Sequence, residues 1–274
     1  MDFERFVECM DNQHGLKIVL LMANSGPSQT MDGIVAAGIR CVDELTRLFE
    51  TQVPPGSCVS FIGHSMGGLI LRYALAHLDE SVFSHYTPKF LICIATPHLG
   101  VSSSESMLVR HGTWWFRHFS QTATDLVNKS ESLLQLSKSR ESLSKFHAVV
   151  FYGNRIRDRI VSLRSALALK DITHVPPASQ LDGDVMTITP FCGSNGVEDP
   201  PDLDNTAATI AHNINTGLQN IKRFIVDSPS GFLVEKFDNS AHTRIIAHAM
   251  LDRNKVGLPM VHHVLEILCQ ESIE

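Results

Sequence analysis

The sequence lacks both a long hydrophobic run and a secretory signal peptide. Its longest apolar runs, at 18–23 and 90–95, have the length of a strand and are too short to cross a bilayer. The first residues, Met-Asp-Phe-Glu-Arg, are acidic where a signal peptide carries a basic segment. We therefore expect a soluble cytoplasmic protein, for which any membrane contact is peripheral.

Cysteine pairs and clusters of basic residues are also absent. The six cysteines show neither CxxC spacing nor the spacing of metal ligands, and several lie inside apolar runs. This pattern predicts buried free thiols in a reducing compartment, without a metal site. The formal net charge of −6, with no basic stripe, argues against a protein that binds nucleic acid.

Composition and length indicate one domain over 1–274. Hydrophobic residues make up 43% of the chain and charged residues 19%, which is enough apolar surface to bury a sheet. Strands are predicted at 17–22, 57–62, 89–95 and 148–152, and helices at 3–10, 31–51, 67–77, 121–145, 206–223 and 258–269. This alternation predicts an α/β fold, with a mostly parallel sheet and helices on both faces.

A short motif links the second predicted strand to the helix after it. The sequence there is Gly63-His64-Ser65-Met66-Gly67, the G-x-S-x-G pattern in the strand–turn–helix setting of a nucleophile elbow. The turn holds the serine in a strained conformation with its hydroxyl exposed, and side chains at 63 and 67 would clash. The Met66 N–H, at the helix start, would meet a developing oxyanion. A glycine-rich turn with a capping serine is the alternative; the flanking strand and helix favour the nucleophile.

A serine nucleophile needs a base, and the base needs an acid to orient it. The predicted strand at 148–152 leads into a loop containing Asp158, which is therefore the expected acid. Its alternative role is a surface ion pair with a neighbouring arginine. Asp182 and Asp184 are weaker candidates, because they lie in a segment at 175–204 whose Pro, Gly, Asp and Ser content predicts a flexible surface insert.

The base is harder to choose, because the chain has 14 histidines. His242 lies in a loop after the apolar segment 232–234, a candidate for the last strand, and His248 is its main rival. His262 and His263 fall within the predicted C-terminal helix and are expected to be structural. We therefore predict His242 as the base.

On these residues the sequence resembles the serine esterase family of eukaryotic lipase-like α/β hydrolases. The most specific matches are FIGHSMGGLILRY at 61–73 and ATPHLG at 95–100, and the likeness spans most of the chain. It implies an α/β-hydrolase fold that hydrolyses acyl lipids, including phospholipids and acylglycerols. It also implies Ser65 as nucleophile, Asp158 as acid and His242 as base.

The resemblance further implies which segments surround the site. The residues expected to line it are His64, Thr96, Pro97, His98 and Leu99. Residues 101–145 would form a cap, and the aromatic cluster at 113–119 either faces lipid or packs into the core.

One family feature is not found in the sequence. Family members carry an upstream strand that ends in His-Gly, and the loop after it donates the second oxyanion N–H. Residues 3–15 resemble the helix that follows that loop, so the first strand or strands of the sheet are expected to be missing. Losing one oxyanion donor costs about 100- to 1000-fold in rate.

Taken together, the residues predict a carboxylic ester hydrolase that works through an acyl-enzyme, without metal or organic cofactor. Two alternatives stay open. One is a non-catalytic protein of the same fold that binds a lipid or a protein partner. The other is an acyltransferase, in which an alcohol replaces water as the acceptor. Thioesters and amides share the same tetrahedral chemistry, and the fold alone does not select among these substrates.

Overall fold

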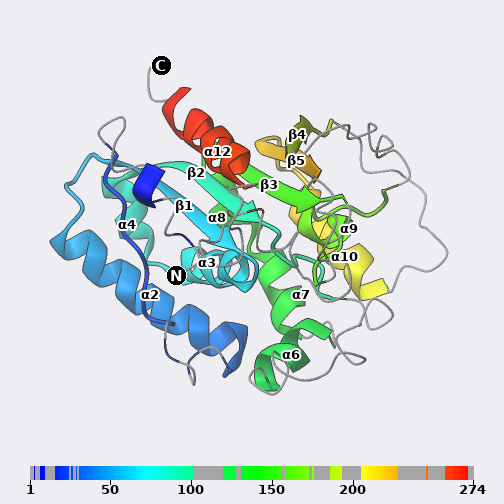
Figure 1. The fold of residues 1–274 in the computed structure, drawn as a ribbon. Coiled ribbons are helices and arrows are strands. Elements are labelled where there is room, and N and C mark those ends of the chain that lie inside the picture. The colour runs from blue at the N-terminus through cyan, green and yellow to red at the C-terminus, as the bar shows by residue number, and fades with distance from the viewer. Residues whose placement is uncertain are drawn as a thin grey trace.

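Within the described residues, five strands form a single sheet in the order β1-β2-β3-β5-β4 (Figure 1). The computed structural model describes residues 3, 7–9, 16–24, 26, 29, 31–101, 120–127, 131–155, 158, 160–172, 175, 186–192, 205–227, 245 and 257–270. The strands are β1 (Cys58–His64), β2 (Thr87–Ile94), β3 (Ala148–Asn154), β4 (Thr187–Pro190) and β5 (Ile221–Asp227). All pairings are parallel except that of β4 with β5. The carboxyl ends of four strands therefore lie along one edge, where sheets of this kind bind ligands.

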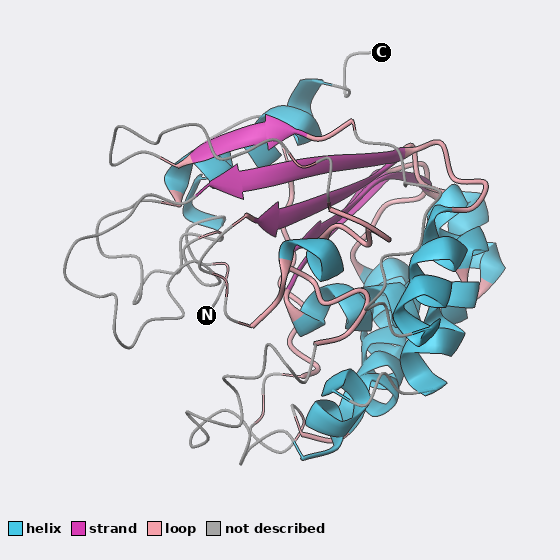
Figure 2. Ribbon diagram, turned by 90° about the vertical axis from the view of Figure 1, so that its right-hand side faces the viewer, coloured by secondary structure: helices cyan, strands magenta, loops and turns pink. Residues whose placement is uncertain are grey.

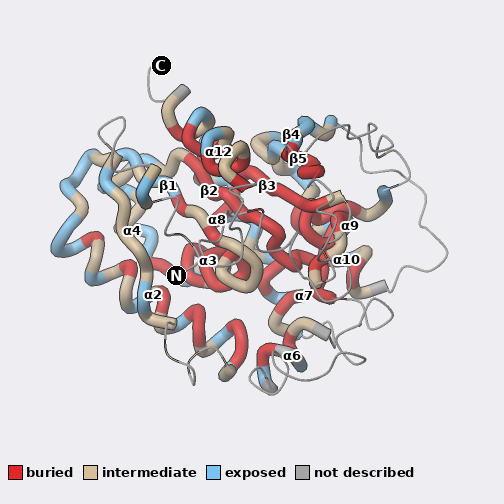
Figure 3. Tube along the Cα trace, viewed as in Figure 1, coloured by how far each residue is buried: buried red, intermediate tan, exposed pale blue. Residues whose placement is uncertain are grey.

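Helices cover both faces of the sheet (Figure 2). They are α2 (Gly33–Thr51), α3 (Met66–His77), α4 (Glu80–His85), α6 (Ser120–Val127), α7 (Glu131–Lys138), α8 (Arg140–Ser144), α9 (Leu163–Ala166), α10 (Asn205–Asn215) and α12 (Leu258–Gln270). Alternate strand residues point to opposite faces. Leu91 and Phe151 join the core under α2, α3 and α7–α10, whereas Ile92 and Tyr152 join the core under α12. Strand β3 is buried along its whole length and β2 over most of its length, whereas β4 at the edge of the sheet is largely exposed (Figure 3). This arrangement of helices on a mostly parallel sheet confirms the predicted α/β fold.

The predicted strand at 17–22 is wrong. Residues 16–22 have no regular secondary structure, and no described strand pairs with them. Their C-terminal end is bound by α2 instead: the N–H groups of Met22 and Ala23 donate to the two carboxylate oxygens of Glu44, at 2.7 and 2.9 Å. An apolar run alone does not make a strand, because the ladder also needs a neighbour.

The predicted helix at 206–223 is too long. Helix α10 ends at Asn215, Gly217 adopts a φ of 76°, and β5 begins at Ile221. A glycine in the left-handed region is a common helix terminator, and the run IKRFIVD after it continues as a strand. Among the described residues, the last parallel strand is therefore 221–227. The segment 232–234, our earlier candidate, lies outside the described residues. Of the helix predicted at 3–10, residues 7–9 are helical.

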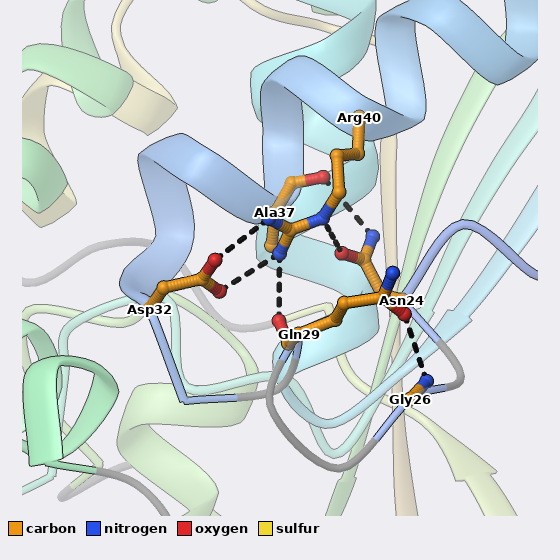
Figure 4. A network of polar contacts seen from close by, with 6 residues as sticks. All are labelled: Asn24, Gly26, Gln29, Asp32, Ala37 and Arg40. Carbon is orange, nitrogen blue, oxygen red and sulfur yellow. Dashed lines mark hydrogen bonds and ion pairs between the residues drawn. The ribbon is translucent and has the colours of Figure 1, made fainter.

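The segment before α2 is held to that helix by Arg40 (Figure 4). The guanidinium makes two bonds to the carboxylate of Asp32, at 2.7 and 2.8 Å, and donates to Asn24 Oδ1 at 2.9 Å and to the Gln29 carbonyl at 2.6 Å. Asn24 in turn donates to the carbonyl of Ala37 at 3.0 Å. Planar, bidentate pairing of this kind fixes orientation as well as distance.

The first turn of α2 is capped from a distant part of the chain. The N–H of Ile34 donates to the Asp125 carboxylate at 2.9 Å, and Asp125, in α6, is buried. Gly33 has a φ of 93°, and a Cβ there would lie 2.6 Å from the same carboxylate. Of the predicted cap at 101–145, the structure describes α6, which packs on α2, α7, which packs on α10, and α8, which packs on α3.

Candidate active site

The structure places Ser65 between β1 and α3 in a strained backbone conformation. Its φ is 53° and its ψ is −130°, in the half of φ space that favours glycine. The Ser65 N–H donates to the carbonyl of Ile94 at 2.9 Å, and its own carbonyl accepts from the Gly68 N–H at 3.1 Å. A non-glycine residue in such a conformation costs about 1–3 kcal/mol and is concentrated at functional sites. This is the geometry expected of a nucleophile elbow.

Two glycines are required around Ser65, but they are not the pair predicted. A Cβ at Gly63 would lie 2.7 Å from the Gly68 Cα, so this position admits no side chain. A Cβ at Gly68 would lie 2.1 Å from Thr96 Oγ1. At Gly67, by contrast, a Cβ would meet no described atom within 4 Å. The prediction is confirmed for Gly63, whereas no described residue requires glycine at 67. The requirement at Gly68 was not predicted because it depends on Thr96, which is distant in the sequence.

Met66 is the first residue of α3. The first N–H groups of a helix have no acceptor within the helix, and the aligned peptide dipoles make this end partially positive. The Met66 N–H is therefore available, beside Ser65, to a developing negative charge. This position is the one predicted for an oxyanion donor.

Asp158 lies beyond the carboxyl end of β3, two strands away from Ser65. Its Oδ1 accepts from the N–H groups of Ile160 and Val161, at 3.0 and 2.9 Å, and its Oδ2 accepts from Asn154 Nδ2 at 3.0 Å. Three donors suit an ionised carboxylate and fix its direction. The alternative of a surface ion pair would use Arg157 or Arg159, which lie outside the described residues.

The predicted base, His242, lies outside the described residues, as do His248, Asp182 and Asp184. The segment that carries His242 follows β5, whose carboxyl end lies at the same edge of the sheet as those of β1 and β3. The triad of Ser65, Asp158 and His242 therefore stays a prediction.

The histidines of α12 are placed on the opposite face of the sheet from α3. His263 Nδ1 lies 2.8 Å from the Tyr152 hydroxyl, and the ring packs edge-on against Tyr152 and Phe224. Burial lowers the pKa of His263. His262 is exposed. His263 fits the structural role expected of it.

The loop after β2 is buried throughout, from Ala95 to Val101. Ala95 has a φ of 47°, a second strained position next to the site. The side chains of Thr96 and His98 are 0% and 1% exposed, and Thr96 packs against Gly68 at the start of α3. The Ser165 hydroxyl of α9 accepts a hydrogen bond from the Leu99 N–H at 3.2 Å and donates one to the Gly100 carbonyl at 2.6 Å. Of the predicted lining residues, His64 is half-buried, and the remaining four belong to this buried loop.

A buried ion pair joins the acid loop to the last parallel strand. Arg155 Nε lies 2.8 Å from Asp227 Oδ1, and the two side chains are 9% and 1% exposed. The Arg155 N–H also donates to the Val226 carbonyl at 2.9 Å. Asp227 is the last residue of β5, so the pair fixes the point from which the segment carrying His242 departs. The sequence analysis predicted neither residue in this role. An Asp at the end of one strand and an Arg after another occur too often for an ion pair to be identified from them.

The described part of the chain was compared with the requirements of a metal site and of a membrane span. Among the described residues, no group of three His, Cys, Asp or Glu side chains is placed to hold a metal ion. In the same part of the chain, no helix has the length and apolar character needed to cross a bilayer.

Comparison with known proteins places this architecture in a family. Residues 3–171 match the family described as "Putative serine esterase (DUF676)", so the chain belongs to that family of α/β-hydrolase type. It is also 28% identical, over 178 residues, to the protein named "Putative lipase ROG1" of Saccharomyces cerevisiae. That match covers 61% of this chain but only 25% of the yeast protein, so the chain spans about a quarter of its relative. No solved structure matches the chain.

Proposed function

We propose that the chain is a serine hydrolase that cleaves carboxylic esters of acyl lipids. The observation that carries the proposal is the backbone of Ser65, a non-glycine residue with a φ of 53° at a strand–helix junction. A protein that used this turn only as a connection would gain nothing from the strain. Family membership and the yeast relative's printed name support an esterase or lipase.

The reaction would proceed through an acyl-enzyme. His242 takes the proton of the Ser65 hydroxyl as its oxygen attacks the ester carbonyl, and Asp158 stabilises the imidazolium that forms. The Met66 N–H stabilises the oxyanion of the tetrahedral intermediate. Collapse of that intermediate expels the alcohol, which receives the proton from His242, and water then releases the fatty acid by the same steps.

The first experiment is labelling of the purified chain with a fluorophosphonate probe, which reacts only with an activated serine. Wild type should be labelled and Ser65→Ala should not, although both fold. A probe-reactive wild type would next be tested on phospholipid and acylglycerol esters, with and without added alcohol, to separate hydrolysis from acyl transfer. A folded wild type that takes no label would refute the proposal in favour of a binding protein.

A further inference from the structure

A buried hydrogen bond joins the helix of the proposed nucleophile to the loop after β2. Arg72, two turns into α3, places Nη1 2.9 Å from His98 Nδ1. Its Nη2 donates to the Leu136 carbonyl at 3.3 Å. The two side chains are 2% and 1% exposed, and no carboxylate pairs with Arg72 in the part of the chain that the structure describes. Burial lowers the pKa of Arg72 to about 10, which leaves the guanidinium charged at neutral pH.

The charge on Arg72 decides the protonation of His98. A guanidinium can only donate, so Nδ1 must accept, and the imidazole is neutral with its proton on Nε2. Burial, and then the charges of Arg72 and Arg223, hold the pKa of His98 well below its usual range. The Nδ1 lone pair is therefore occupied by Arg72. Although His98 stands in the most specific motif of the chain, it is not free to take a proton at that atom.

The loop that His98 anchors contacts the nucleophile from two directions. The carbonyl of Ile94, the last residue of β2 before the loop, accepts the N–H of Ser65 at 2.9 Å. Two residues on, Thr96 packs so closely on the first turn of α3 that Gly68 admits no Cβ. A shift between the loop and α3 would therefore move Ser65 and the adjacent Met66 N–H together.

We infer that Arg72 and His98 are positioning residues for the proposed ester hydrolysis: their hydrogen bond fixes the first turn of α3 against the loop after β2. The inference rests on the proposed function. The pair is expected to affect the transition state and not substrate binding. The reason is that the Met66 N–H must lie within hydrogen-bond distance of an oxyanion that the ground-state ester lacks. A misplacement of about 1 Å can cost about 100-fold in rate. Loss of the bond should therefore lower kcat and leave KM nearly unchanged.

The test compares His98→Leu with His98→Asn in the full chain. Leucine removes the acceptor, whereas the asparagine side-chain oxygen can take the place of Nδ1. Hydrolysis of a soluble p-nitrophenyl ester should show a fall in kcat of about 10- to 100-fold for the leucine variant, with KM within about twofold. The asparagine variant should recover most of the loss. Because the two residues act through one bond, Arg72→Met combined with His98→Leu should be no slower than Arg72→Met alone.

Circular dichroism and thermal unfolding identify variants that are folded. If either leucine or methionine prevents folding, Arg72→Lys and His98→Asn carry the test, since lysine keeps a donor and asparagine keeps an acceptor for the bond. Equal kcat values for the leucine and asparagine variants, additive effects in the double variant, or a change confined to KM would each overturn the inference. These results would leave the proposed function standing if wild type is labelled by the fluorophosphonate. An unlabelled, folded wild type would overturn both.

Discussion

The turn at Ser65 and the turn at Asp158 lie at the same edge of the sheet but are held in different ways. Ser65 is held by backbone sterics: a strained φ, a backbone bond to Ile94 and glycines that leave no room for a side chain. Asp158 is held by hydrogen bonds from its own side chain to two N–H groups and to Asn154. Steric requirements restrict a position to one residue type, whereas hydrogen bonds can be met in several ways. A substitution at a required glycine of the first region should therefore displace the turn as a whole, whereas substitutions around Asp158 should remove its charge or its hydrogen bonds one at a time.

The largest effect is expected at the acid. Asp158→Asn keeps an oxygen for the N–H groups of Ile160 and Val161 but removes the charge that would stabilise an imidazolium. We expect kcat to fall about 10⁴-fold while the thermal unfolding midpoint changes little. Ester hydrolysis by the purified variant measures this, with Asp43→Asn on the exposed face of α2 as the matched control. A variant as active as this control would remove Asp158 from the mechanism.

The ion pair beside Asp158 gives the next effect, on stability. Arg155→Met leaves Asp227 buried without its partner, which costs about 3–5 kcal/mol in the free energy of unfolding. Lys145→Met, which breaks the exposed pair with Glu80, should cost about 1 kcal/mol or less. Urea denaturation of both variants compares them directly. Equal costs would show that the Arg155–Asp227 pair does not hold the acid loop to β5.

The same contrast explains how much the sequence predicted. Steric requirements appear in the sequence as a local pattern of residue types. The sequence therefore predicted, near their observed bounds, the elbow at 63–67, the helix after it and the strands β2 and β3. Gly68 and Arg72 were not singled out, because their roles depend on Thr96 and His98, more than 25 residues away in the chain.

Two errors in the elements have the same origin. The apolar run at 17–22 has the composition of a strand, but pairing is decided by neighbours in space, and Glu44 of α2 binds its end instead. The helical pattern at 206–223 did not register Gly217 as a terminator, so β5 was missed. Periodicity describes a segment by itself, whereas a parallel strand is defined by partners that are distant in sequence.

Two adjacent glycines test the steric side of the comparison. Gly68→Ala places a Cβ 2.1 Å from Thr96 Oγ1, so α3 or the loop after β2 must move. We expect kcat to fall about 100-fold, with a loss of about 1–3 kcal/mol in stability. Gly67→Ala makes the same chemical change one residue away in the same helix turn, where no described atom lies within 4 Å. It should retain activity and gain up to about 1 kcal/mol from the higher helix propensity of alanine. Similar behaviour of the two variants would contradict a steric origin for the elbow.

The smallest effect tests the loop after β2, which touches both regions: Thr96 packs on Gly68, and Leu99 donates to Ser165 beyond the acid turn.

His98 is neutral in the folded chain because burial, Arg72 and Arg223 lower its pKa, whereas in the unfolded chain it titrates near its ordinary pKa of about 6.5. Below that pH the unfolded chain binds a proton that the folded chain does not. The free energy of unfolding therefore loses about 1.4 kcal/mol per pH unit on acidification, and nothing above pH 6.5. Urea denaturation between pH 7 and 5 should show this slope in wild type and a reduced slope in His98→Asn. An equal slope in the two proteins would mean that His98 takes up a proton in the folded state, and Arg72 would then have no acceptor there.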